Sequence, residues 1–133
     1  MKRQMLAARL ALLGASLWST SGDNAAAEQL SPDRVKLPAM TPVLNLGKLS
    51  YDAKCAQCHG LNIAGTDKGP TFLHRVYHPN HHADGAFFLA PKRGVRAHHW
   101  RFGNMPPVKD ISDNQIKAII AYVRAVQQAN GIF

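Results

Sequence analysis

Cysteine is scarce in this chain, whose 133 residues include only two, Cys55 and Cys58. A disulfide framework is therefore excluded as the source of stability, because a bridge between thiols three positions apart closes too small a loop to constrain the fold. A second C-x-x-C pair, with which a structural zinc site usually completes its four ligands, is also missing. A metal site built on the two thiols would have to recruit histidines from elsewhere in the chain.

Long apolar runs are missing as well. The most apolar run, residues 10–18, is too short to cross a bilayer as a helix, and it follows a basic start with Lys2, Arg3 and Arg9. An A-x-A type cut at Ala27 completes the pattern of a secretory signal peptide. The sequence predicts a signal peptide over residues 1–27, and the alternative is a retained amphipathic anchor. Cleavage would leave a periplasmic chain of 106 residues with no membrane span.

Acidic side chains are few: eight Asp and Glu stand against sixteen Lys and Arg, a net charge of +8. Removal of residues 1–27 leaves 13 basic and 7 acidic side chains, and a net charge of +6. Such a surface favours acidic partners, and we expect redox partner proteins with acidic docking surfaces. The cations are scattered rather than gathered in a run, which argues against nucleic acid as a partner. They include Lys48, Lys54, Lys68, Arg75, Lys92, Arg93, Arg96 and Arg101.

The two cysteines are followed directly by His59, in the pattern C-x-x-C-H. Two thiols one helical turn apart can add to the vinyl groups of a haem, and the adjacent imidazole can bind its iron. A thioredoxin-like dithiol would need alternating strands and helices around it, and no such pattern is present. A copper or zinc site that combines the thiols with histidines is the other alternative.

Two amphipathic segments flank this motif. Residues 45–54 predict a first helix, with Asn45 as N-cap and an apolar face of Leu46, Leu49 and Ala53. Gly47 within this helix suggests a close approach by another helix. Residues 28–44, which contain three prolines, read as an extended N-terminal arm.

Residues 111–128 predict the clearest helix of the chain. Ser112 and Gln115 form a capping box, and an apolar stripe follows at helical spacing. The first helix is the expected partner of this stripe, whereas Lys117 and Arg124 are expected to lie on the solvated face. The stripe consists of Ile116, Ile119, Ile120, Val123 and Val126.

The segment between the two helices is rich in turn residues and histidines. Asp84 is expected to cap a short helix that stops or kinks at Pro91, and residues 95–101 suggest another turn or two of helix. The histidines favour a polar loop with backbone hydrogen bonds over a second metal site. They are His74, His78, His81, His82, His98 and His99.

Pro70 and Met105 are the remaining candidate site residues. The carbonyl of Pro70 is free to accept the second N–H of an iron-bound histidine, the alternative being an ordinary turn proline. Met105 lies in a stiff loop before Pro106 and Pro107, where a thioether can be presented to a haem iron. The alternative is a methionine that only packs within the loop.

Taken together, these motifs resemble those of the monohaem class I c-type cytochromes. The resemblance rests on Gly47-x-x-x-Tyr51-x-x-x-Cys55-Ala-Gln-Cys58-His59-Gly60, Gly69-Pro70, Asn104-Met105-Pro106-Pro107 and the last helix. It implies an all-α fold in which the N- and C-terminal helices cross around one covalent haem c, with a cytochrome c domain over residues 45–133.

The resemblance also implies a role for each candidate residue. Cys55 and Cys58 would carry the thioether links, His59 the proximal iron bond, Met105 the distal bond, and Pro70 the carbonyl that accepts from His59. The histidine-rich insert, residues 72–99, departs from the family pattern, so that His98 or His99 is an alternative distal ligand.

Three functions follow as hypotheses. The first is a periplasmic one-electron carrier, not an enzyme, because an iron with both axial positions filled has no place for substrate. The second is a haem c subunit of a larger dehydrogenase or oxidase complex. The third is a Cys/His copper or zinc protein.

Overall fold

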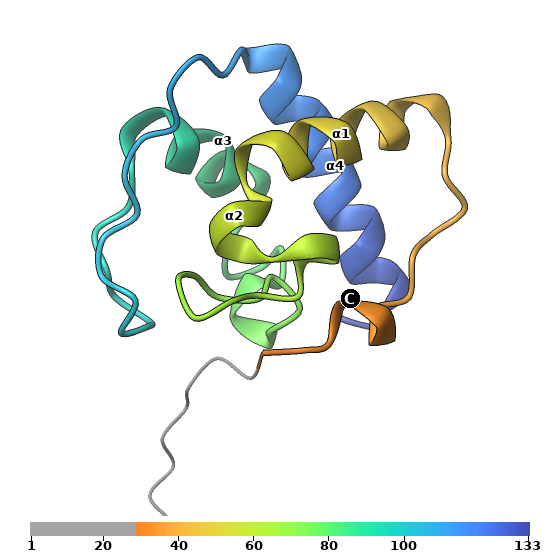
Figure 1. Cartoon of the computed structure of the whole chain (residues 1–133), viewed down its shortest axis with the longest axis horizontal. Helices are drawn as coiled ribbons and strands as arrows, with labels where there is room; N and C mark the ends of the chain where they lie inside the picture. The colour runs from red at the N-terminus through yellow and green to blue at the C-terminus, as the bar shows by residue number, and fades with distance from the viewer. Residues whose placement is uncertain (1–28) are drawn as a thin grey trace, which may run out of the picture.

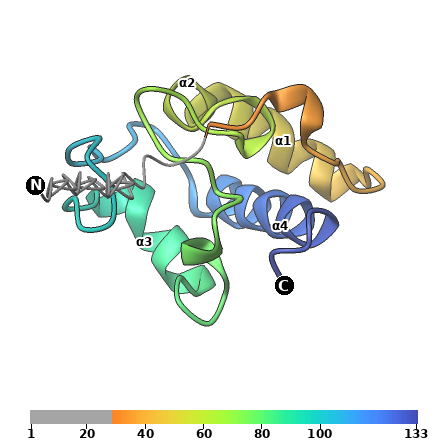
Figure 2. The same ribbon diagram turned by 90° about the horizontal axis from the view of Figure 1, so that it is seen from below.

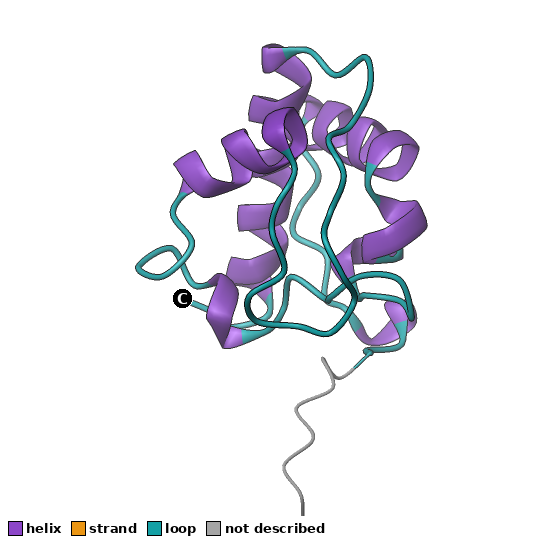
Figure 3. Cartoon of the chain, turned by 90° about the vertical axis from the view of Figure 1, so that its left-hand side faces the viewer, coloured by secondary structure: helices purple, strands orange, loops and turns teal. Residues whose placement is uncertain are grey.

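Helices and the loops between them make up the described chain, residues 29–133, in the computed structural model (Figure 3). The only β pairing among these residues is an isolated antiparallel bridge between Val95 and Met105. The all-α fold class is therefore confirmed. None of the helices in this range is both long and apolar enough to cross a membrane. The expected signal peptide and its cut site lie outside the described residues.

Helix α1, Pro42–Lys54, crosses helix α4, Asp113–Ala129, at the centre of the molecule (Figure 1). Gly47 allows the crossing, since a Cβ at this position would lie 2.8 Å from the Cβ of Tyr122. The N-cap of α1 is Thr41, whose side chain accepts from the Leu44 N–H, so the prediction of Asn45 as N-cap was wrong. Pro42 can begin the helix because its missing N–H has no partner in the first turn anyway.

The buried face of α1 is the opposite of the one expected. Gly47, Ser50 and Tyr51 are buried, whereas Leu46 and Leu49 are 57% and 69% exposed. The close crossing explains this result, because small residues let the two helix backbones approach and the leucines are left outside the contact. The apolar face of α1 therefore remains on the surface.

Helix α4 agrees with the sequence in its capping and its apolar stripe. The Ser112 side chain accepts from the Gln115 N–H and the Gln115 side chain accepts from the Ser112 N–H, which completes the capping box. Its inner face forms most of the core with Tyr51 and Ile63. Five of its residues are at most 1% exposed. They are Ile116, Tyr122, Val123, Val126 and Gln127.

Helix α3, Asp84–Arg93, lies on the other side of α4 from α1 (Figure 2). Its N-cap is Ala83 rather than Asp84, and it runs through Pro91 instead of stopping there. Pro91 lies two residues before the helix ends, so its ring costs a single helical hydrogen bond, and its carbonyl still accepts from the Val108 N–H at 2.8 Å. The prediction of Asp84 as N-cap was therefore wrong, and the helix does not stop at Pro91.

Residues 95–101 form no helix, which corrects a further expectation. Gly94, at a φ of 75°, ends α3 and turns the chain so that Val95 pairs with Met105. A Cβ at Gly94 would also lie 3.1 Å from the Cδ of the Pro107 ring. The segment from Val95 to Met105 is consequently a closed loop rather than a continuation of the helix.

The N-terminal segment, residues 29–41, packs onto the domain and contains a short 3-10 helix, η1, Pro32–Arg34. Val35 is buried in the core, and the Leu30 N–H donates to the Ala64 carbonyl. Asn130 exchanges two hydrogen bonds with the backbone of Lys36, which brings this segment beside the C-terminus (Figure 1). The last residues of the expected arm, 42–44, belong to α1.

Candidate functional site

An apolar cavity of about 310 Å³ lies between α3, α4 and the C-x-x-C-H segment. Cys55 and His59 line it, and so does Met105, which lies 46 positions after His59 in the sequence. Pro70 lines it as well. Most of the remaining wall is apolar and comes from α3, α4 and the loops beside them. Its aromatic members are Phe72, Tyr77, Phe87, Trp100 and Phe102. Three histidines of the insert, His82, His98 and His99, line the cavity as well, so the alternative distal ligands His98 and His99 share it with Met105.

The two thiols lie at the junction of α1 and the short helix α2, Ala56–His59. Cys55 is the C-cap of α1, and its carbonyl accepts from the Cys58 N–H at 3.2 Å, so the thiols are one turn apart. Cys58 is exposed, whereas Cys55 is half-buried, and burial, with a smaller contribution from Cys58, raises the pKa of Cys55 to about 11. Both thiols are free, as the attachment of a haem requires.

His59 is buried and held in one orientation. Its Nδ1–H donates to the Pro70 carbonyl at 3.0 Å, which leaves the lone pair on Nε2. The Phe72 ring stacks on the imidazole at 4.3 Å between centroids. Burial lowers the pKa of His59, and the hydrogen bond to Pro70 opposes this shift only in part. The imidazole is therefore neutral near pH 7, the form that binds a metal.

The loop that carries Pro70 is fixed against α2. A Cβ at Gly69 would lie 2.9 Å from the Cys58 carbonyl oxygen, so only glycine lets the loop come this close. The Thr66 hydroxyl donates to the same carbonyl. These contacts hold the Pro70 carbonyl in place for His59, and they tie the loop to the cysteine segment.

Met105 enters the cavity wall from the closed loop of residues 95–105. The two hydrogen bonds of its bridge with Val95 measure 2.9 and 3.0 Å. Pro106 and Pro107 follow directly, so the backbone after Met105 is stiff. Met105 and His59 therefore line the same cavity.

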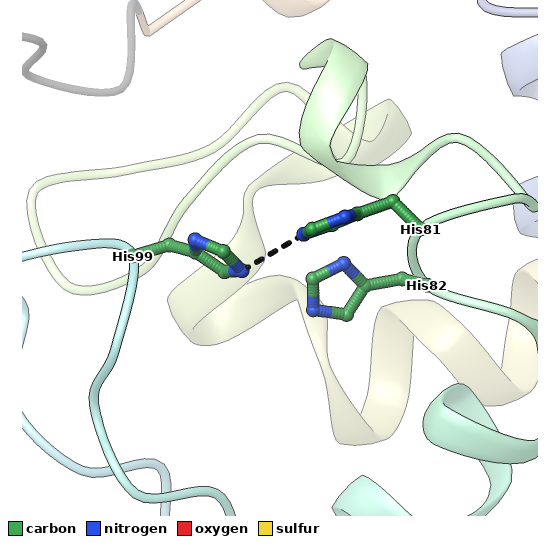
Figure 4. A group of neighbouring side chains, drawn as sticks. All are labelled: His81, His82 and His99. Carbon is green, nitrogen blue, oxygen red and sulfur yellow. Dashed lines mark hydrogen bonds between the residues drawn. The ribbon is translucent and has the colours of Figure 1, made fainter.

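The histidine-rich insert contains a group that the sequence did not reveal. His81, His82 and His99 place one ring nitrogen each within 4.8 Å of the others (Figure 4). The other three histidines of the insert make backbone hydrogen bonds through Nδ1, as expected for a polar loop. Those of His74 and His78 accept from backbone N–H groups, and that of His98 donates to the Arg96 carbonyl. The two His-His doublets were the available signal, but nothing in the sequence showed that the doublets meet.

Arg124 has a different role from the solvated one expected. Its side chain is only 12% exposed and forms a salt bridge with Asp84 at 2.7 Å. The guanidinium also donates to the carbonyls of Tyr77 and His82, and to the side chain of Gln127. Arg124 therefore holds the histidine-rich loop against α4.

A family model described as Cytochrome c matches residues 44–127, more than half of the chain. No curated protein matches the chain at a significant level. Together with the C-x-x-C-H spacing, the family match assigns one covalent haem c to Cys55 and Cys58. The apolar cavity and the neutral imidazole beside it fit such a group. The proposal of a Cys/His copper or zinc site is not supported, because neither cysteine belongs to the group of potential metal ligands in residues 29–133.

Proposed function

We propose that this chain, which belongs to the cytochrome c family, is a one-electron carrier whose iron has histidine and methionine as axial ligands. One observation carries the proposal: Cys55, His59 and Met105 line the same apolar cavity. When bound, the haem supplies a one-electron Fe(III)/Fe(II) couple. The chain's own residues bind it, orient its ligands and exclude water.

His59 is proposed as the proximal ligand through Nε2. The Pro70 carbonyl takes the Nδ1–H, and this fixes the ring and makes the imidazole a stronger donor. Met105 is proposed as the distal ligand, and a thioether in this position favours a comparatively high reduction potential. With both positions filled from the chain, no site for substrate is left, which supports a carrier rather than an enzyme.

The test is addition of an exogenous ligand to the ferric haem protein. With both axial positions filled, millimolar imidazole should leave the visible spectrum unchanged, and a potentiometric titration should show a single one-electron step. Rapid imidazole binding by the wild-type protein would mean that the distal position is open, and the carrier proposal would then fail.

We further propose a periplasmic location, which rests on the signal-peptide pattern of residues 1–27. Fractionation of cells that produce the full chain tests it. The haem-stained protein should appear in the periplasmic fraction with residues near Ala27 removed. Its recovery with the membranes, uncut, would favour the retained anchor.

Acidic redox partners are proposed to dock beside the 95–105 loop. Arg96 and Arg101 are exposed in this loop, and neither forms a salt bridge with any residue in 29–133. Complementary charge accelerates association and makes the rate sensitive to salt. Arg96→Glu with Arg101→Glu should slow electron transfer to an acidic partner at low salt. Lys36→Glu, which reverses an exposed charge away from this loop, is the control (Figure 1). If it slowed electron transfer as much as the double variant, the proposed docking site beside the 95–105 loop would be contradicted.

The subunit hypothesis is kept as a second candidate because of the exposed face of α1. Val43, Leu46 and Leu49 are 59%, 57% and 69% exposed. Apolar side chains at this density favour a protein contact. Gel filtration of the protein from its own host separates the two candidates, since a free carrier elutes as a monomer and a subunit elutes within a larger complex.

A further inference from the structure

The histidine group, of which His82 and His99 line the haem cavity and His81 does not, has the geometry of a metal site. His81 and His82 come from the loop before α3, and His99 comes from the 95–105 loop, so the group joins two segments (Figure 4). The Nε2 atoms of His81 and His99 are 3.3 Å apart. Two imidazole nitrogens bound tetrahedrally to one ion at about 2.05 Å would be separated by about 3.3 Å. Two of the three ligands are therefore already at the required spacing.

The third imidazole is oriented by the backbone. The Nδ1–H of His82 donates to the Val76 carbonyl at 2.7 Å, which leaves the lone pair on Nε2. Metal-binding histidines commonly donate their second N–H to a carbonyl in this way. Since the three ligand atoms span at most 4.8 Å, a modest movement of one ring would bring all of them to a common ion.

Both segments are held in place by contacts outside the group. Arg124 donates to the His82 carbonyl, and it anchors the loop further through Tyr77. On the other side, the Trp100 indole N–H donates to the Tyr77 hydroxyl at 3.0 Å, next to His99. A site held by such contacts loses less entropy on binding a ligand.

The chemistry of the group selects the kind of ion. Three imidazoles without a carboxylate or a thiolate suit a borderline divalent ion and leave a fourth position for water. Among divalent ions that accept nitrogen ligands, Cu²⁺ binds more tightly than Zn²⁺.

We propose that His81, His82 and His99 form a second metal site, which binds one Cu²⁺ or, more weakly, one Zn²⁺ per chain. The site is distinct from the proposed iron ligands His59 and Met105. It joins the loop before α3 to the loop that carries Met105, so a bound ion would cross-link the two segments.

The experiment is calorimetric titration of the ferric haem protein with CuCl₂ and ZnCl₂ in a buffer that does not bind metals. We expect one strong site per chain, tighter for Cu²⁺, and nitrogen hyperfine structure in the Cu²⁺ EPR spectrum. Zn²⁺, which is redox-inactive, should also raise the melting temperature, because it binds the folded chain.

The variants His81→Ala and His99→Ala change exposed side chains, and each should weaken Cu²⁺ binding at least about 10-fold. His78→Ala, in the same loop but outside the group, is the matched control and should bind as the wild type does. If His81→Ala and His99→Ala bound Cu²⁺ as tightly as His78→Ala and the wild type, the proposal would be overturned.

Two further outcomes keep this site separate from the carrier function. If His99→Ala changed the visible spectrum of the metal-free ferric protein, His99 would be an iron ligand and the proposed second site would be wrong. If Cu²⁺ binding followed the expected pattern while imidazole reached the iron readily, the second site would stand and the carrier proposal would fail.

Discussion

Gly47 of α1 lies directly against α4, where a Cβ at Gly47 would come within 2.8 Å of the Tyr122 Cβ and would also meet the Ala118 backbone. The contact is between helix backbones, so it has no flexible side chain that could move aside. The two helices hold the cysteine segment and the cavity wall respectively, and their distance therefore affects both the fold and the site.

Gly47→Ala should lower the free energy of unfolding by about 3 kcal/mol, because the added methyl group has no space at the crossing. Gly85→Ala is the matched control, since a Cβ at Gly85 in α3 would have no neighbour within 4 Å. It should leave stability unchanged or raise it by less than about 1 kcal/mol. Guanidinium unfolding of the ferric protein, followed by circular dichroism, measures both. Equal effects of the two variants would show that the crossing tolerates a methyl group.

Two buried tyrosines beside this crossing should respond differently to loss of their hydroxyl groups. The Tyr51 hydroxyl donates to the Gly60 carbonyl at 2.8 Å, whereas the buried Tyr122 hydroxyl has no hydrogen-bond partner among residues 29–133. Tyr51→Phe should therefore cost about 1–3 kcal/mol, since it leaves the Gly60 carbonyl unpaired. Tyr122→Phe should be neutral or slightly stabilising. The same unfolding measurement compares the pair, and a larger loss in Tyr122→Phe would contradict this account.

Arg124 provides a third prediction, because its planar guanidinium reaches several acceptors that a lysine ammonium cannot reach together. It binds Asp84, and it also binds the carbonyls of Tyr77 and His82. Arg124→Lys keeps the charge but should lower the free energy of unfolding by about 2 kcal/mol. Lys117→Ala, at an exposed position of the same helix, should change it by less than about 0.5 kcal/mol. If Arg124→Lys changed the free energy of unfolding as little as Lys117→Ala, the charge rather than the hydrogen-bond geometry would hold the loop.

The parts of the fold that the sequence predicted well depend on local patterns. The capping box of Ser112 and Gln115 and the apolar spacing of α4 are contained within a single helix. The C-x-x-C-H motif is equally local, and the family match supports its interpretation. Gly47 was informative because a glycine inside a helix usually has a packing reason.

The errors concern contacts between distant segments. Periodicity placed Leu46 and Leu49 on one face of α1, but it could not show that the face with Gly47 would be buried instead. Likewise, Arg124 has the spacing of an exposed residue, and only the loop folded over α4 supplies its partners. His99 reaches His81 across 18 positions of the chain, a contact that no local pattern predicts.

Met105 is the residue on which the proposed electron-transfer site depends most directly. Met105→Ala should lower the reduction potential and open the ferric iron to imidazole, because a thioether ligand raises the potential and blocks the distal position. Met40→Ala is the control: Met40 packs against the core and does not line the cavity. Potentiometric and imidazole titrations of both variants measure the effect. An unchanged spectrum and potential in Met105→Ala would exclude Met105 as the ligand, and the same titrations of His98→Ala and His99→Ala would then identify which histidine replaces it.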